Sequence, residues 1–169
     1  PSQCVYGEAL NVVWNFMVYL QNKVRSYNCL AASDIDNIKE CVRDINTLME
    51  NLKYLVEHVQ HPVYTVDLYR AIESYNKYIN GVLFMQIVQN SKPKPNYLIK
   101  IIRGILQCLR EVDGNIKSLS AIYSSYFAQF VPTLIKYYNG LMYYQAALEQ
   151  AEKNEYGVAI AYLRIGLKT

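Results

Sequence analysis

The sequence predicts an all-helical fold, and three observations support that prediction. Glycine and proline are scarce, at seven and five of 169 residues, so few positions favour turns. No segment alternates apolar and polar residues in the sustained way that is typical of a half-buried strand. Apolar residues instead recur three and four positions apart over long segments, which is the spacing of an amphipathic helix. A chain of this length with 52% hydrophobic residues can bury the core of one domain.

The first helix is expected over residues 5–30. Its predicted apolar stripe consists of Trp14, Met17, Val18, Leu20 and Val24. The stretch "AASDID" predicts the start of the second helix, with Ser33 as N-cap and two acidic residues in the first turn, where the helix dipole favours negative charge. We expect this helix to end at "HPVY", because Pro62 disfavours the helical conformation at His61.

The third helix is expected to start near Thr65 and to end before "NSKPKPN", where two prolines interrupt the helical pattern. Pro95 or Asn96 then opens a fourth helix. Its apolar residues on one face are Leu98, Ile101, Ile102, Ile105, Leu109 and Val112. The turn pair Asp113-Gly114 either ends this helix or is spanned by it.

The remaining sequence predicts a short helical piece over 118–127 and then two longer helices. Pro132 suits the first turn of a helix, where its missing N–H has no intrahelical partner to lose, and we expect that helix to run to about Asn154. A short polar turn is expected at Lys153 to Gly157, and the last helix is expected to begin near Tyr156. The small residues Ala147, Ala159 and Gly166 would let these two helices approach closely, with Tyr143 and Leu163 filling the space beside them. This spacing is similar to one tetratricopeptide hairpin, but no second copy occurs 34 residues away.

Few residues offer enzyme chemistry. Glu57, His58 and His61 fall within one helical turn, but the histidines are three residues apart and have no third ligand nearby in the sequence. The four cysteines, Cys4, Cys29, Cys41 and Cys108, are not spaced as a metal or redox motif, and we expect free thiols. There is no glycine-rich phosphate loop and no GxSxG sequence. We therefore expect a protein that is not an enzyme and holds neither cofactor nor metal.

The charge balance is mildly basic, with a net charge of +3 and an isoelectric point near 8.6. This permits an acidic partner, but it lacks the dense basic stripe of a nucleic-acid-binding protein, so we expect no nucleic acid. A weak association with a membrane surface is a further expectation. The start "PSQCVYGEAL" has no basic residue followed by an apolar run, so we expect no signal peptide and a cytoplasmic protein. The missing initiator methionine and the ending "LRIGLKT" suggest a piece of a longer chain.

The tail "VPTLIKYYNGLMYYQAALEQAEKNEYGVAIAYLRIGL" resembles the signature region of the Bro domain, the helical domain of the ALIX and BROX group. In that family a proline-led helix ends in a Tyr-x-x-small stretch, and a polar turn and an aromatic-Gly-x-x-Ile-Ala-x-Leu stretch follow. The matching residues here are Pro132, Tyr144, Ala147, Tyr156, Gly157, Ile160, Ala161 and Leu163. The family's acidic residues after the glycine and its basic residue before the leucine are replaced by Val158, Ala159 and Tyr162.

The resemblance implies that residues 1–169 are part of a Bro-type domain, with long antiparallel helices in a tetratricopeptide-like right-handed solenoid. It also implies an adapter in endosomal sorting, recruited to endosomal membranes, that binds the amphipathic C-terminal helix of an ESCRT-III subunit. The anchors carried over by position are Leu83 or Phe84, Tyr97 and Ile101. The family's basic residue near the first anchor falls at Gln86, and Lys100 is the nearest replacement.

Two questions stay open at this point. Apolar residues at 97, 98, 99, 101 and 102 surround the first turns of the fourth helix, so either both faces are buried or one edge is the floor of a groove. The alternative function is an unrelated tetratricopeptide-like scaffold for protein interactions with no ESCRT link. An enzyme built around His58 and His61 is the third reading.

Overall fold

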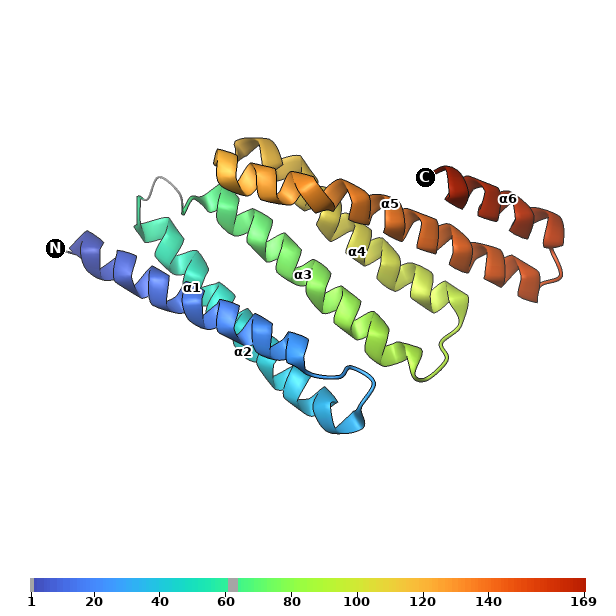
Figure 1. Cartoon of the computed structure of the whole chain (residues 1–169), viewed down its shortest axis with the longest axis horizontal. Helices are drawn as coiled ribbons and strands as arrows, with labels where there is room; N and C mark the ends of the chain where they lie inside the picture. The colour runs from blue at the N-terminus through green and yellow to red at the C-terminus, as the bar shows by residue number, and fades with distance from the viewer. Residues whose placement is uncertain (1, 61–63) are drawn as a thin grey trace. The chain divides into compact units, whose positions relative to one another are not determined.

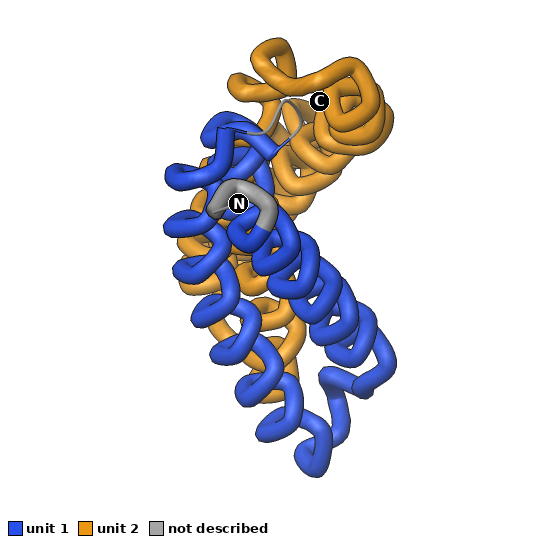
Figure 2. Tube along the Cα trace, turned by 90° about the vertical axis from the view of Figure 1, so that its left-hand side faces the viewer, with its two compact units in different colours: residues 1–73 blue, residues 74–169 orange. Residues whose placement is uncertain are grey.

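The computed structural model describes residues 2–60 and 64–169, and within these residues the protein is all-α, as predicted, with no strand (Figure 1). Side chains are described from Val5 onward. The helices in chain order are α1 (Ser2–Ser26), α2 (Ala32–His58), α3 (Val66–Gln89), α4 (Pro95–Asn115), the 3-10 turn η1 (Ile116–Ser118), α5 (Ala121–Glu152) and α6 (Tyr156–Lys168). The chain divides into two compact units, residues 1–73 and 74–169, so the boundary falls within α3 (Figure 2).

In the first unit, α1 and α2 form an antiparallel hairpin whose apolar faces meet. The buried residues of α1 are Leu10, Met17, Leu20 and Val24, and those of α2 include Ile38, Cys41, Ile45, Met49 and Leu52. The predicted stripe of α1 was therefore wrong at Val18, which is exposed, and it missed Leu10, which is buried. The ring of Trp14 packs at 5.9 Å from that of Tyr64, at the margin of this core.

The connection between α1 and α2 differs from the prediction at both ends. Helix α1 ends at Ser26 rather than near residue 30, because the N–H of Asn28 donates to a carboxylate oxygen of Asp34 (2.9 Å) and so belongs to the loop. The predicted N-cap at Ser33 is wrong. Ala31 occupies the cap position without a side-chain hydrogen bond, and the Ser33 hydroxyl instead donates to Asp34 (3.5 Å).

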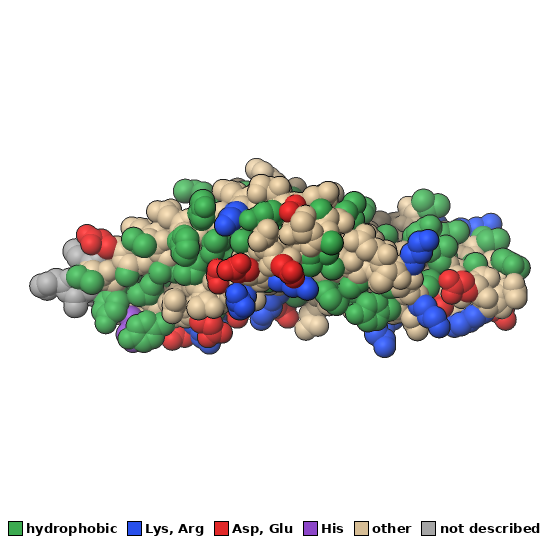
Figure 3. Space-filling model, turned by 90° about the horizontal axis from the view of Figure 1, so that it is seen from below, with side chains coloured by type: hydrophobic (Ala, Val, Ile, Leu, Met, Phe, Trp, Pro, Cys, Tyr) green, Lys and Arg blue, Asp and Glu red, His purple; other side chains and the backbone are tan. Residues whose placement is uncertain are grey.

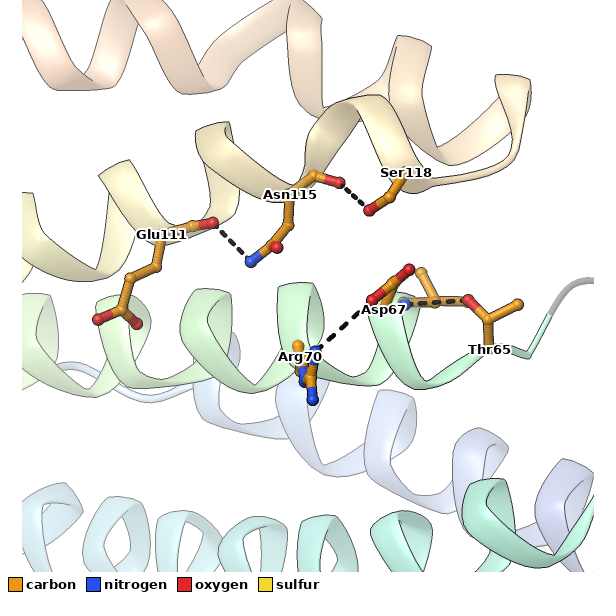
Figure 4. Close-up of polar contacts among 7 residues, drawn as sticks. Thr65, Asp67, Arg70, Glu111, Asn115 and Ser118 are labelled. Carbon is orange, nitrogen blue, oxygen red and sulfur yellow. Dashed lines mark hydrogen bonds and ion pairs between the residues drawn. The ribbon is translucent and has the colours of Figure 1, made fainter.

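The starts of α3 and α4 confirm the predictions. Thr65 accepts the N–H of Leu68 on its hydroxyl (3.2 Å) and so caps α3 (Figure 4). Pro95 is the first residue of α4. Helix α4 spans Gly114 and ends at Asn115, whose side chain donates to the carbonyl of Glu111 (2.8 Å) and whose own carbonyl accepts the hydroxyl of Ser118 (2.8 Å; Figure 4).

Helix α5 corrects the prediction of two pieces, because residues 121–152 form one continuous helix with Pro132 inside it. Proline in a helix interior removes one backbone hydrogen bond. The packing explains why the helix continues. Phe127, Val131 and Tyr138 are buried and lie four and seven residues apart, so one apolar face runs through the proline without a break. Pro132 itself is exposed, on the side where water can satisfy the freed carbonyl.

The core of the second unit lies between α3, α4 and α5. Its buried members are Tyr78, Met85, Leu98, Ile102, Ile105, Leu106, Leu109 and Tyr138. The rings of Tyr78 and Tyr138 pack edge to face at 6.0 Å, and their hydroxyls share a hydrogen bond. Burial raises the pKa of both tyrosines. Among the described side chains, no buried nitrogen or oxygen lacks a hydrogen-bond partner, so this core hides no unsatisfied polar group.

The last two helices form a close antiparallel hairpin, with Ala147 and Ala159 buried as predicted. Of the predicted turn at Lys153 to Gly157, residues 153–155 connect the two helices, whereas Gly157 lies in the first turn of α6. The left-handed residue is Asn154 (φ 62°), with the N–H of Glu155 donating to the carbonyl of Gln150 (2.9 Å), the pattern of a Schellman C-cap. Leu163 is 41% exposed, so it does not fill the crossing as expected.

Candidate functional site

The predicted anchors lie on the hairpin of α3 and α4, whose register follows from one close contact. A Cβ atom placed on Gly81 would lie 2.8 Å from Cγ1 of Ile105, so α3 approaches α4 at this level. Because the helices run antiparallel, Phe84 is then level with the turn of α4 that contains Ile101. The five-residue loop between the helices, residues 90–94, contains no helical residue that would change this register.

One face of this hairpin is marked by a polar group of residues. The hydroxyl of Ser74 donates to the carboxylate of Glu111 (3.1 Å), and the charges of Lys77 and Glu111 both act on the Cys108 thiol. Burial, and then Glu111, raise the pKa of Cys108, so the thiol stays protonated. Phe84 lies seven residues after Lys77, and Tyr97 lies eleven residues before Cys108. Both spacings return to the same side of a helix, so Phe84 and Tyr97 share this face.

Exposure separates the predicted anchors into two kinds. Phe84 and Tyr97 are 47% and 43% exposed, and Lys100 is exposed as well. Ile101 is partly buried and packs against the core of the second unit, at the edge of the same face. Phe84, Tyr97 and Lys100 are therefore all accessible on the α3–α4 hairpin, and Ile101 packs against its core. We call these four residues the α3–α4 surface.

Leu83 does not belong to this surface. Gly81 faces α4, and Leu83 follows it by two residues, which places its side chain on the opposite side of α3. Of the two residues that the resemblance offered for the first anchor, Phe84 is the one on the shared face. The apolar residues at the start of α4 also fall into two groups. Leu98, Ile99 and Ile102 are buried, whereas Tyr97 is exposed.

The charge around the α3–α4 surface is mostly basic, with Glu111 as an acidic residue on the same face. Residues 74–110 contain six lysine and arginine residues and no aspartate or glutamate. Beside it, α4 and α5 form a concavity lined by Arg103, Gln107 and Arg110 from α4 and Met142 from α5. Arg110 donates to the side-chain oxygen of Asn139 (3.3 Å), which holds the guanidinium at the rim. A ligand on this surface meets a positive field, which favours one with acidic residues.

A second surface, between α5 and α6, was missed by the sequence reasoning. Two apolar ridges run along it, each with the spacing i, i+4, i+7, i+11. They consist of Tyr137, Leu141, Tyr144 and Leu148 on α5, and of Tyr156, Ile160, Leu163 and Leu167 on α6. Seven of these eight are classed as exposed, and Leu141 is partly buried. We call this surface the α5–α6 groove.

The middle and open end of the α5–α6 groove form a concavity of about 390 Å³. Its lining joins Tyr137, Leu141 and Tyr144 to Leu163 and Leu167, so the two ridges lie on the same side of the hairpin. Gly140 and Gly166 also line it, and a Cβ on Gly166 would lie 3.1 Å from Cβ of Tyr143. The two glycines let the helices meet closely and leave the groove open above them. The signal for this groove was present in the sequence as two ridge spacings, but their alignment required the hairpin.

On the face drawn in Figure 3, hydrophobic side chains are interspersed with charged ones. His58, at the end of α2, donates from Nδ1 to the carbonyl of Tyr54 (2.7 Å), and the centres of the two rings lie 4.1 Å apart with the ring planes tilted by 30°. His61 lies outside the described residues. No group of three or more potential metal ligands occurs in the described part of the chain.

The described cysteines Cys29, Cys41 and Cys108 are free thiols, and the side chain of Cys4 lies outside the described part. Among the helices that the structure describes, none has the length and apolar character needed to cross a bilayer. Comparison with known protein families, curated proteins and solved structures gives no match to this chain.

Proposed function

We propose that the protein is a non-enzymatic adapter that binds an amphipathic helix on the α3–α4 surface. The observation that carries the proposal is the exposed aromatic pair Phe84 and Tyr97, on a helix pair whose other apolar residues largely form the core. Exposed aromatic residues on one face of a helical scaffold are typical anchors for a partner helix. The resemblance to the Bro domain supports the same surface, because it carries the family's partner site to these residues.

The proposal includes the finer expectations that follow from this resemblance. The helices form part of a Bro-type, tetratricopeptide-like right-handed solenoid. The partner is the amphipathic C-terminal helix of an ESCRT-III subunit, and the adapter acts in the cytoplasm and is recruited to endosomal membranes. The all-helical architecture and the antiparallel succession of α3, α4, α5 and α6 support this arrangement.

The chemistry of the surface defines how the partner helix would bind. Phe84 and Tyr97 contact apolar residues spaced i, i+3, i+4 and i+7 on the partner, and Ile101 completes the inner edge of the contact. Lys100 faces an acidic residue on the partner's polar flank, supported by the positive field of Arg103 and Arg110. Removal of an anchor side chain typically costs about 2 kcal/mol of binding free energy, roughly thirtyfold in affinity.

The test is a titration of a labelled C-terminal helix of an ESCRT-III subunit with the protein and its variants. Phe84→Ala and Tyr97→Ala should each weaken binding by about tenfold or more, and Lys100→Glu should weaken it less. Ile122→Ala is the matched control, because Ile122 is an exposed apolar residue on α5 away from both surfaces. Ile101 is unsuitable for a charged substitution, since it packs against the core.

Circular dichroism of each variant establishes that it is folded before the affinities are compared. If the ESCRT-III helix binds to the parent and to both alanine variants with equal affinity, the α3–α4 surface is not the site. If the parent shows no binding to helices of this class, the adapter has no ESCRT link, and the reading as an unrelated helical scaffold replaces it.

A further inference from the structure

We propose that the α5–α6 groove binds a second amphipathic helix, and that the polar flank of this helix is acidic. This site is separate from the α3–α4 surface and does not depend on the function proposed for it. The α3–α4 surface is formed by residues of α3 and α4, and the groove is formed by residues of α5 and α6. Helix α5 also contributes residues to the core that underlies α3 and α4.

The shape of the groove fits one helix. Ridges of side chains spaced i, i+4, i+7 on two antiparallel helices leave a furrow between them, into which the residues of a third helix can pack. The floor is low at Gly140 and Gly166, where no side chain rises between the ridges. Tyr137 and Tyr144 on one side and Leu163 and Leu167 on the other then form the walls.

Helix α6 exposes more apolar side chains than is usual for a surface helix, which normally buries one apolar face. Its one buried residue is Ala159, while Ile160 and Leu167 are 51% and 88% exposed. A large contiguous apolar surface of this kind marks a site of interaction with another protein element. The charged residues of α6 are Arg164 and Lys168. Most of the circumference of the helix is therefore apolar.

The charges around the groove decide what kind of helix binds there. Lys136 is the charged residue of the lining, and Arg164 and Lys168 flank the ridge on α6. Residues 74–169 contain eleven lysine and arginine residues and five aspartate and glutamate residues, a net charge of +6. Two copies of this unit repel each other, whereas a helix with acidic residues is attracted.

The acids of the hairpin also define the orientation of the partner. Glu149, Glu152 and Glu155 are grouped at the turn between α5 and α6, where Lys153 pairs with Glu149 (3.0 Å) and leaves a net negative charge. Lys136 and Lys168 are at the open end of the hairpin. The acidic residues of the partner helix therefore lie over the open end, near Gly140 and Gly166. Its apolar residues, at i, i+3, i+4 and i+7, fill the furrow.

The test uses a labelled synthetic helix of about 18 residues, or five turns. It has leucine at the apolar positions and glutamate at the polar positions of the end that lies over the open end of the hairpin. A second peptide has lysine in place of each glutamate. The parent protein should bind the acidic peptide at least about tenfold more tightly than the basic one, as measured by fluorescence anisotropy.

Leu163→Ala and Tyr144→Ala should each weaken binding of the acidic peptide by about tenfold or more. Ile165→Ala is the matched control. Ile165 has a similar exposure to Leu163, but it follows Leu163 by two residues and so lies about 160° round the helix. Lys136→Glu should remove the preference for the acidic peptide, and Lys117→Glu, which reverses an exposed charge elsewhere in the unit, should leave it unchanged.

Equal binding of both peptides, or equal effects of Leu163→Ala and Ile165→Ala, would contradict the proposal. Light scattering tests whether a second copy of the chain occupies the groove instead. A parent protein that is dimeric, with a Leu163→Asp variant that is monomeric, would assign the groove to a second copy and would contradict the proposal. The variants Phe84→Ala and Tyr97→Ala should bind the acidic peptide like the parent. Loss of peptide binding in those variants but not in Leu163→Ala would place the peptide on the α3–α4 surface and would overturn the inference.

Discussion

At Gly166 the space for a side chain is almost closed, and at Gly157 it is open. A Cβ on Gly166 would lie 3.1 Å from Cβ of Tyr143 and 3.4 Å from the carbonyl oxygen of Gly140, neither of which is the free end of a flexible side chain. At Gly157 no heavy atom lies within 4 Å of the corresponding position. Both glycines lie in α6, so alanine improves helix propensity at each. The two positions differ in that Gly166 lies where α6 crosses α5 closely and Gly157 does not.

We predict that Gly157→Ala stabilises the protein by up to about 1 kcal/mol, because it reduces the freedom of the unfolded chain without a clash. Gly166→Ala should be less stable than Gly157→Ala by about 1 kcal/mol or more, since the added methyl group pushes α6 away from α5. Urea denaturation of the two variants and the parent measures the difference. Equal stabilities would show that the crossing adapts to a side chain at Gly166.

Asn154 shows how a single residue sets the geometry of the hairpin. Its backbone is left-handed, a conformation that asparagine and glycine adopt more readily than other residues. The N–H groups of Asn154 and Glu155 close the end of α5 by donating to the carbonyls of Ala151 (3.0 Å) and Gln150 (2.9 Å). The reversal of the chain is therefore decided two residues before α6 begins, and Gly157 contributes no turn.

At the scale of the element, the α5–α6 hairpin depends on small residues along its inner faces. Ala147 and Ala159 are buried, and Ala161, two residues further along α6, is exposed. The same substitution at Ala159 and Ala161 thus separates packing from helix propensity. The chain offers this matched pair within half a turn of α6.

We predict that Ala159→Leu destabilises the protein by about 1–3 kcal/mol, because the added carbon atoms must separate two helices that are already in contact. Ala161→Leu should change stability by less than about 0.5 kcal/mol, as expected for an exposed helix position. Thermal unfolding followed by circular dichroism compares the two variants. A variant Ala159→Leu as stable as Ala161→Leu would mean that the hairpin is loosely packed.

Helix α5 illustrates how packing determines the extent of an element. Pro132 removes one hydrogen bond, which by itself favours a break or kink. The buried apolar face formed by Phe127, Val131 and Tyr138 passes on both sides of the proline, with Phe127 against the ring of Tyr75 on α3 and Tyr138 in the core between α3, α4 and α5. The burial of three large side chains outweighs the loss of one backbone hydrogen bond on the exposed side, so one helix forms where the sequence suggested two.

Across the whole chain, the charges are divided unevenly. Residues 1–73 contain six lysine and arginine residues and nine aspartate and glutamate residues, a net charge of −3, whereas residues 74–169 have a net charge of +6. The modest overall charge of +3 therefore conceals a strongly basic unit. Both proposed helix sites lie in that unit, so electrostatic attraction contributes to each of them.

We predict that binding of acidic helices weakens as salt is added. Raising the ionic strength from about 0.05 M to about 0.5 M shortens the Debye length from roughly 14 Å to roughly 4 Å and screens the exposed cations. The affinity for the acidic peptide should fall by at least about threefold, while the affinity for the basic peptide should not fall. Anisotropy titrations at several salt concentrations measure this. An affinity independent of salt would leave apolar contact as the whole basis of recognition.

The sequence by itself determined the helical class and most of the helix positions, because helical periodicity, Thr65 and Pro95 act over a few neighbouring residues. It also determined that the first turns of α4 carry more apolar residues than one face needs. It did not determine which of them are exposed, since the choice between Leu83 and Phe84 depends on how α3 turns toward α4.

Tertiary structure decided the register of α3 against α4, the continuity of α5 and the form of the α5–α6 groove. Each of these depends on contacts between residues that are distant in the sequence, which no single segment specifies. The close approach of Gly81 to Ile105 sets the register that places Phe84 level with Ile101, about one turn from Tyr97 along α4. The continuity of α5 through Pro132 follows from burial against α3 and α4. The α5–α6 groove exists only once Asn154 reverses the chain and the glycines at 140 and 166 let the two ridges align. A periodic pattern specifies a face, and only packing specifies what that face meets.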